Sequence, residues 1–307
     1  MQAVRTIFAV LLALVSASGM AQSDNKAAST PGPSLAATAD ADSLSEDQIR
    51  GLIRLAAEKD MENDKRQRDY TFVEREEEHK LDGRGNVKSV ESKTYEIMEL
   101  YGEPVERLTA KDDKPLSSKE AAKEEEKIQK IIDKRKNESE SARNKRLEKE
   151  EKEREDGRKF VREVADAYNF KLAATEQFEG RPTYVIDATP RPGYEPHLKD
   201  AKFLPKFKFR LWLDKTDTEW VKLDIQCIDT VSVGLVLARI HKGSNIQIEQ
   251  TRVNDEVWLP QHIAVKLDAR LALLMGVNLT EEISYRDYKK FRTDTKITPV
   301  GEVREQK

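Results

Sequence analysis

The sequence predicts an α+β domain in which helices cover one face of a large, curved antiparallel sheet. Residues 257–279 place an apolar side chain at almost every second position, with Gln261 as the exception, and this spacing gives a strand one apolar face. Further alternating segments follow Asn169 and are joined by short turns, which is typical of antiparallel neighbours. Amphipathic stripes that begin near Ser43 and Phe160 supply helices that can cover the sheet.

The alternating stretch 257–279 is far longer than the usual strand of about 5–6 residues, so we expect it to bend or break. Pro260 and residues 276–278 are the expected positions, because proline lacks a ladder donor and glycine weakens a strand. The stretch therefore predicts a long, curved strand with one apolar face.

Charge and composition exclude some classes of partner. The 307 residues carry a formal net charge of −3, which is too small to indicate nucleic acid or an anionic membrane surface. Charged residues make up 36% of the chain, well above the usual share of about a quarter, and aromatic residues only 7%. We therefore expect part of the chain to be solvated and the apolar core to be local.

Residues 1–21 have the pattern of a secretory signal peptide. Arg5 precedes the apolar run 7–15, and small residues lead to an expected cleavage after Ala21. The apolar run is too short to span a bilayer. The next residue is Gln22 and not cysteine, so we expect no lipid anchor. The mature protein is predicted to be an exported, soluble monomer without a transmembrane segment.

Residues 22–42 consist mostly of small and polar residues and predict a disordered linker. An amphipathic helix is expected to follow, with Ser43 and Glu46 as its capping box. Its apolar stripe consists of Ile49, Leu52, Ile53, Ala56 and Ala57. This helix either packs directly on the sheet or also lines a ligand cavity.

Residues 69–102 predict a β-hairpin with its turn at 82–86. The glutamates within 74–78 break the alternation, so these strands are expected at an edge of the sheet or highly exposed. Gly83 and Gly85 do not indicate phosphate binding, because no helix follows them.

Residues 117–156 are dominated by lysine, glutamate and arginine and contain no glycine or proline. They predict a solvated helical hairpin or arm, with a protein-docking arm as the alternative. Ile128 and its neighbours can dock one turn, whereas residues 137–144 are expected to fray. A second amphipathic stripe then runs from Phe160 and ends at Asn169.

The remainder of the chain is predicted to be almost entirely strand. The expected strands are Phe170–Ala174, Thr183–Ala188, Phe207–Leu213, Glu219–Ile228, Val231–Ile240, Ile246–Val253, Val257–Met275 and Leu279–Arg292. Their alternating apolar residues can gather on one face, and we expect that face to surround a hydrophobic ligand. The candidate ligand-binding residues are Phe209, Leu211, Leu213, Leu223, Ile225, Val233, Ile263, Val265 and Leu267.

Three segments resemble the periplasmic lipoprotein carriers of the LolA type and the wider outer-membrane lipoprotein-sorting group. They are Phe178–Pro190, Phe209–Ile225 and Val253–Val265, with a glycine before a Tyr-x-Ile strand, an aspartate at a hairpin tip and a Trp-Leu-Pro at a strand start. The resemblance implies an unclosed β-barrel whose concave face, lidded by helices, holds acyl chains. It further implies a periplasmic location and a lipid or an acylated lipoprotein as partner.

The resemblance covers the helix from Ser43 and most of residues 170–292, and residues 111–157 depart from it. We therefore expect a single domain over 43–295 with a charged helical insertion at 117–156. A flexible tail is expected at 296–307.

Enzymatic classes find little support in the sequence. The four histidines are scattered and Cys227 is the single cysteine, so no metal site is expected; we predict that Cys227 is a buried strand residue. Gly-x-Ser-x-Gly does not occur, and the single Ser-x-x-Lys, at Ser23 and Lys26, falls in the predicted linker. We predict no catalytic residue and no cofactor.

The rival hypothesis is a non-enzymatic module that binds or senses an envelope protein through the charged arm, with the apolar face filled by its own helices. A ligand cavity distinguishes the two hypotheses, and a pocket of about 300–1,000 Å³ is expected for the carrier.

Overall fold

The computed structural model describes residues 44–101, 103–198, 201–233, 238–271 and 275–290. Its helices are α2 (Glu46–Gln67), α3 (Ser118–Lys136), α4 (Glu140–Ala167) and the short 3-10 helix η2 (Leu204–Lys206). Its first strands are β1 (Tyr70–Leu81), β2 (Val87–Leu100), β3 (Glu103–Lys111), β4 (Lys114–Pro115), β5 (Tyr168–Phe178) and β6 (Arg181–Pro190). The others are β7 (Phe207–Asp214), β8 (Trp220–Cys227), β9 (Val231–Val233), β10 (Ala238–Ile240), β11 (Asn245–Val253), β12 (Val257–Leu271) and β13 (Met275–Lys290).

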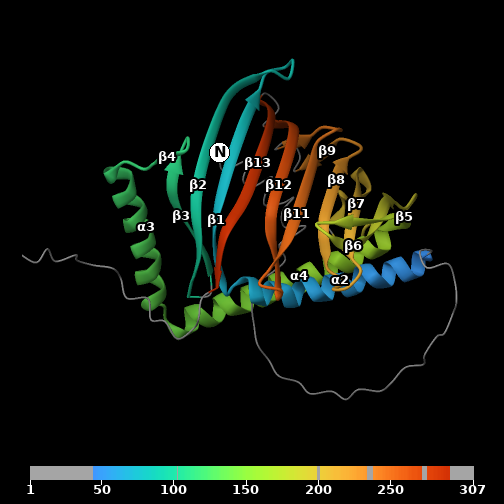
Figure 1. Cartoon of the computed structure of the whole chain (residues 1–307), viewed down its shortest axis with the longest axis horizontal. Helices are drawn as coiled ribbons and strands as arrows, with labels where there is room; N and C mark the ends of the chain where they lie inside the picture. The colour runs from blue at the N-terminus through green and yellow to red at the C-terminus, as the bar shows by residue number, and fades with distance from the viewer. Residues whose placement is uncertain (1–43, 102, 199–200, 234–237, 272–274, 291–307) are drawn as a thin grey trace, which may run out of the picture.

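The strands form one 13-stranded sheet whose pairings are antiparallel. Its order is β4-β3-β2-β1-β13-β12-β11-β8-β7-β6-β5, and β10 joins β9 to β12 beside this path. Within the described residues, the end strands β4 and β5 do not pair, so the sheet is not closed. Figure 1 shows α2 and α4 side by side along one end of the strands and α3 beside β3. The predicted α+β class with an unclosed antiparallel sheet is confirmed.

Helix α2 begins two residues later than expected. Its N-cap is Ser45, which forms a capping box with Gln48, so the predicted box of Ser43 and Glu46 is wrong. Both pairs fit the capping pattern, but the later start places two acidic residues in the first turn, next to the positive end of the helix dipole. The predicted apolar stripe is confirmed, since Ile49, Ile53 and Ala56 are buried and Leu52 and Ala57 are partly buried.

A β-bulge interrupts β12 at Gln261. Gln250 of β11 pairs with Pro260, whereas the preceding Glu249 pairs with His262, so Gln261 is an extra residue in β12. The single polar exception to the alternation is therefore the residue that leaves the ladder register.

The bulge moves the apolar residues of β12 from one face of the sheet to the other. On the regular strand β11, Ile248 pairs with Ile263, whereas Thr251, on the opposite face, pairs with Leu259. Leu259 accordingly packs with Tyr70, apart from the main cluster that contains Ile263. The expectation of one continuous apolar face is wrong, because a one-residue insertion inverts every side chain that precedes it.

The alternating stretch 257–279 forms two strands of a hairpin and not one curved strand. Strand β12 ends at Leu271, which pairs with Met275 at the start of β13, so the second strand has already begun before the expected break at 276–278. The segment 231–240, expected as one strand, likewise forms the antiparallel pair β9 and β10.

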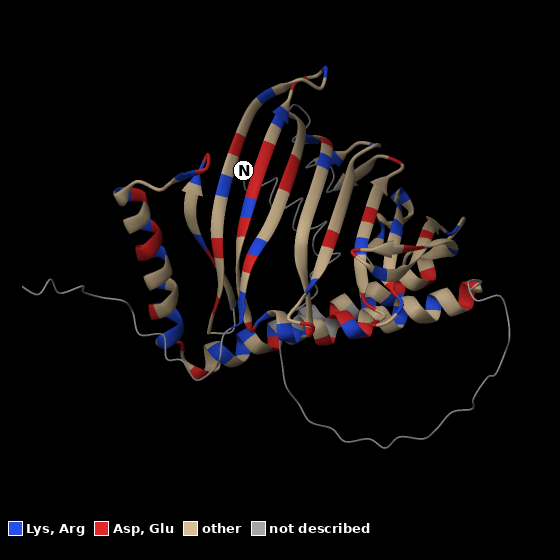
Figure 2. Ribbon diagram, in the orientation of Figure 1, with Lys and Arg blue, Asp and Glu red and all other residues tan. Residues whose placement is uncertain are grey.

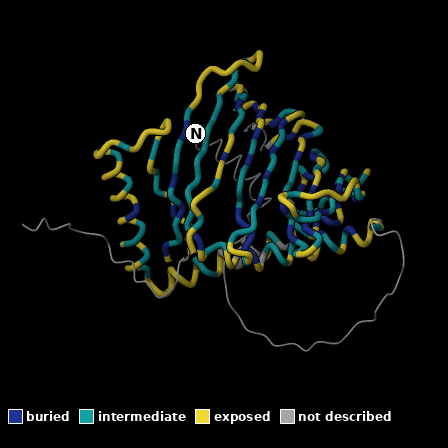
Figure 3. Tube along the Cα trace, in the orientation of Figure 1, coloured by how far each residue is buried: buried dark blue, intermediate teal, exposed yellow. Residues whose placement is uncertain are grey.

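The hairpin β1–β2 has the predicted turn. Asp82 Oδ1 accepts hydrogen bonds from the backbone N–H of Arg84 at 2.7 Å and of Asn86 at 2.9 Å, and Gly85 has a φ of 85°. The expectation of an edge position is wrong, because β1 pairs with β13 and β2 pairs with β3, a strand that the sequence analysis did not identify. The outer end of this hairpin is exposed and extends beyond the rest of the sheet (Figure 3).

The charged segment forms the helical hairpin α3–α4, and Figure 2 marks its charged residues along the ribbon. Ile128 of α3 is 5% exposed and packs with Leu100 and Val105 of the sheet. The expected fraying is wrong for residues 140–144, because Ser139 caps α4 with a 3.2 Å bond from the N–H of Ala142. Helix α4 also continues through Gly157 to Ala167. The end of the expected insertion and the amphipathic stripe from Phe160 therefore belong to one helix.

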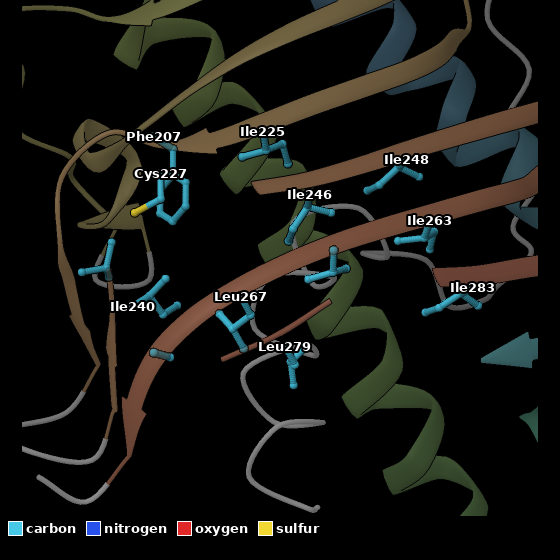
Figure 4. Close-up of a cluster of buried hydrophobic side chains, with 13 residues drawn as sticks. Phe207, Ile225, Cys227, Ile240, Ile246, Ile248, Ile263, Leu267, Leu279 and Ile283 are labelled. Atoms are coloured by element: carbon cyan, nitrogen blue, oxygen red, sulfur yellow. The ribbon is translucent and has the colours of Figure 1, made fainter. Parts of the chain in front are cut away.

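The core has two large clusters. One lies between α2, α4, η2 and strands β5 to β7. The other lies along β7 to β13, and Figure 4 shows its side chains. Cys227 belongs to the second cluster at 1% exposure, which confirms its prediction as a buried strand residue.

Candidate hydrophobic ligand site

A cavity of about 170 Å³ lies between the helices α2 and α4 and the strands β7 and β8. Apart from one acidic and two aromatic polar side chains, its lining is apolar. The lining residues are Ile53, Ala56, Ala57, Asp60, Phe160, Val161, Val164, Tyr168, Phe203, Leu204, Phe207, Phe209, Leu211, Trp220, Leu223 and Ile225. The alternation of β7 and β8 and the stripe of α2 therefore point their apolar side chains into one shared space.

Four of the predicted ligand-binding residues line this cavity: Phe209, Leu211, Leu223 and Ile225. They come from β7 and β8, where Phe209 pairs with Ile225 and Leu211 pairs with Leu223. The hairpin thus brings the four side chains to one face.

The other predicted residues lie elsewhere. Leu213 is 1% exposed in the cluster next to the cavity but does not line it. Ile263, Val265 and Leu267 belong to the second core cluster, along β12. Val233 ends β9, and its side chain lies outside the described residues. All nine were expected on one face, whereas the structure divides those that it describes between two clusters, and Ile225 of the cavity wall shares its cluster with Ile263.

Part of the cavity wall comes from residues that were not among the predicted site residues. Helix α4 contributes Phe160, Val161 and Val164, and the segment before β7 contributes Phe203 and Leu204. The apolar stripe near Phe160 was expected to cover the sheet, but its residues were not predicted to line the cavity. Phe203 and Leu204 carry no periodic signal, because they lie in and before a short 3-10 turn.

The hydroxyl of Tyr168 is satisfied inside the protein. It lies 2.7 Å from the carbonyl oxygen of Leu204 and 3.1 Å from that of Phe207. Burial raises the pKa of this phenol well above its ordinary value. Tyr168 therefore closes one end of the cavity as a neutral, hydrogen-bonded group.

The other end of the cavity carries an acidic side chain. Trp220 Nε1 donates a hydrogen bond to Asp60 Oδ1 at 2.9 Å, and both residues line the cavity and are partly exposed. Glu219, next to Trp220, is 7% exposed, and burial together with the charge of Asp60 raises its pKa to about 8. This end therefore combines an apolar wall with negative charge.

Helix α2 is held over the cavity by polar contacts at several points. Arg50 Nε donates to the carbonyl oxygen of Ala165 in α4 at 3.0 Å. Lys59 Nζ donates to the carbonyl oxygen of Asp217 at 2.6 Å, in the loop between β7 and β8. These contacts tie α2 to α4 and to the β7–β8 loop on either side of the cavity.

The hairpin tip that precedes β8 is organised by Asp214, the tip aspartate of the sequence resemblance. Asp214 is 0% exposed and accepts two hydrogen bonds from Arg181, at 2.6 and 3.0 Å. It also accepts from the backbone N–H groups of Thr216 and Asp217. Burial alone would raise the pKa of Asp214, but the Arg181 contact and the backbone N–H groups lower it.

Two further observations bear on function. Among the described residues, no group of three or more His, Cys, Asp and Glu side chains is placed to hold a metal ion. In the same part of the chain, every helix is too short or too polar to cross a membrane.

Comparison of the sequence with known proteins finds no match, whereas comparison of the structure finds similar solved structures. No protein-family model matches the chain, and a search of curated proteins finds no match. The fold is similar to a domain from Vibrio parahaemolyticus named for outer-membrane lipoprotein sorting, with 12% identity, a TM-score of 0.33, and coverage of 80% of this chain and 95% of that chain. It is also similar to a LolA-superfamily protein from Nitrosomonas europaea, with 11% identity, a TM-score of 0.31, and coverage of 81% and 95%.

A third similar structure is a DUF1329-family protein from Desulfovibrio piger, with 11% identity, a TM-score of 0.28, and coverage of 79% of this chain and 92% of that chain.

Proposed function

We propose that this protein binds a hydrophobic ligand, such as a lipid or the acyl chain of a lipoprotein, in the cavity between α2, α4, β7 and β8. The observation that carries the proposal is the apolar lining of that cavity, to which β7 and β8 contribute Phe209, Leu211, Leu223 and Ile225. Ligand pockets are typically apolar, with few polar groups that orient the ligand. The protein binds its ligand and does not convert it.

The volume limits how much of a ligand the cavity encloses. At about 170 Å³ it is smaller than the pocket expected from the sequence. An engineered apolar cavity of about 150 Å³ accommodates benzene, so this one suits an apolar group of about six carbons. A short chain, or the end of a longer chain, fits this volume.

The proposed location is the periplasm, because residues 1–21 have the pattern of a secretory signal. These residues lie outside the described part of the chain. Mass measurement of the protein from its own host tests this location: a mature form that begins near Gln22 supports it, and retention of residues 1–21 contradicts it.

The test of the binding function is native mass spectrometry, with lipid extraction, of protein purified from its own host. The second measurement is uptake of an uncharged hydrophobic fluorophore. Leu223→Trp should reduce uptake, because the larger side chain occupies the cavity. Absence of both a co-purified apolar molecule and fluorophore uptake would contradict the proposal.

The protein-binding alternative remains a prediction. Within the described residues, α3 docks its apolar side on the sheet through Ile128, so its charged side faces outward. Co-purification of an envelope protein that is lost when those charges are reversed, without any bound apolar molecule, would favour this alternative.

A further inference from the structure

The cavity has two chemically different ends. Along the hairpin, Phe207 pairs with Cys227 near one end and Leu213 pairs with Trp220 near the other. Of the lining residues, Phe207 belongs to the first end and Trp220 to the second. A ligand that lies along these strands therefore has one group near Phe207 and another near Trp220.

The end near Phe207 is apolar and enclosed. Phe207 and Leu204 are 6% and 4% exposed, and the hydroxyl of Tyr168 is engaged by their carbonyl oxygens. No charged side chain lines this end among the described residues. It suits the methyl end of an apolar chain.

The end near Trp220 is acidic and meets solvent. Asp60 is the one charged residue among the described lining residues, and it holds the indole N–H of Trp220 at 2.9 Å. Asp60 and Trp220 are both partly exposed, so a ligand head group can reach them without complete desolvation. Positive charge would be favoured here and negative charge disfavoured.

The described cations near this end are engaged by other acceptors. Lys59 does not line the cavity, and its ammonium group donates to the carbonyl oxygen of Asp217. Arg181 and Arg252 both pair with the Asp217 carboxylate, at 2.8 and 3.2 Å. The raised pKa of the neighbouring Glu219 is consistent, since burial and the charge of Asp60 already oppose a second negative charge there.

We propose that the cavity selects an amphiphile with an apolar chain and a positively charged amine head group, with the chain toward Phe207 and the amine beside Asp60. The inference rests on the proposed binding function and names its ligand class. A free fatty acid is the disfavoured case, because its carboxylate would lie beside Asp60.

The test compares three probes with the same apolar chain: hexylamine, hexanol and hexanoate. Near pH 7 the amine is cationic and the acid anionic, since groups of these types titrate near about 10.4 and about 4.3. Their dissociation constants are measured by calorimetry or ligand-observed NMR at low salt. We expect hexylamine to bind at least about tenfold more tightly than hexanoate, with hexanol between them.

Two variants identify the source of the preference. Asp60→Asn keeps the shape and removes the charge, and should bring the hexylamine and hexanoate constants within about threefold of each other. Trp220→Phe keeps Asp60 and removes the indole N–H, and should retain the preference for the amine. If Asp60→Asn does not fold, the three probes on the unmodified protein decide the question.

The outcomes separate the two proposals. Equal binding of the three probes, or tighter binding of hexanoate, would overturn the amine preference and leave the hydrophobic site standing. Amine preference that persists in a folded Asp60→Asn variant would also overturn the role of Asp60. Failure of all three probes to bind would count against the cavity as a ligand site and against the binding function itself.

Discussion

The side-chain amide of Asn63 forms two hydrogen bonds with the backbone of Trp258. Asn63 Nδ2 donates to the carbonyl oxygen of Trp258 at 2.7 Å, and Asn63 Oδ1 accepts from its N–H at 2.7 Å. Asn63 and Trp258 are 4% and 5% exposed. Asn63 of α2 thus supplies hydrogen-bond partners to the backbone N–H and carbonyl groups of Trp258 in β12, which are buried from water.

Asn63→Ala should lower the free energy of unfolding by about 1–3 kcal/mol, because it leaves a buried N–H group without its acceptor. Urea unfolding at neutral pH measures this change. Gln67→Ala is the control, since Gln67 also donates to Trp258 O, at 2.9 Å, but is partly exposed. An equal decrease in the free energy of unfolding in both variants would show that the buried hydrogen bonds of Asn63 stabilise the fold no more than the partly exposed one of Gln67.

Leu223→Trp should cost little stability, because Leu223 borders the cavity and the added atoms can occupy it. Ile263→Trp is the matched control: Ile263 is 4% exposed in the packed core along β12, so the larger side chain should cost about 1–3 kcal/mol through overpacking. Chemical unfolding of both variants gives the two losses. A cost for Leu223→Trp as large as that of the control would argue that the space is filled.

Glu219 should make the protein less stable as pH rises. Its pKa is about 8 in the folded protein, against an ordinary value of 4.5, so between these values the folded state binds more protons than the unfolded state. The free energy of unfolding therefore falls as pH rises from about 5 to about 8, by at most about 1.4 kcal/mol per pH unit from this group.

Glu219→Gln isolates this contribution, because glutamine keeps the shape and does not titrate. The variant should gain stability relative to the unmodified protein as pH rises, as measured by urea unfolding at several pH values. A difference that does not change with pH would mean that Glu219 ionises normally.

Ile128→Ala should lower the free energy of unfolding by about 2–5 kcal/mol if α3 unfolds only together with the sheet. If α3 detaches by itself, its amides should exchange faster while those of β7 and β8 stay protected. Hydrogen exchange distinguishes the two cases. Gln129→Ala, at an exposed neighbouring position, should change neither quantity.

The helices and most strands of this protein can be predicted because their signals are local. The stripe of α2 recurs with the period of a helix, and the turn at Asp82 uses an aspartate and Gly85 within five residues. Strand β3 lacked such a signal, since its residues Glu103–Lys111 mix charged and apolar side chains without clear alternation.

The candidate site could be predicted only in part. The alternation of β7 and β8 identified Phe209, Leu211, Leu223 and Ile225, because neighbouring strands of a hairpin share their faces. The same alternation also pointed to Ile263, which shares a core cluster with Ile225 but does not line the cavity. Periodicity indicates which side chains are buried and does not indicate which of them share a space.

The sequence by itself determined the period-two alternation, the helical stripes and the turns, since each depends on residues a few positions apart. Only the tertiary structure decided that Gln261 bulges and inverts the face of β12, because a bulge depends on the register of the neighbouring strand. It also decided that Asp60 meets Trp220 at one end of an apolar cavity. Those residues are 160 positions apart, and their contact exists only because α2 packs across the sheet.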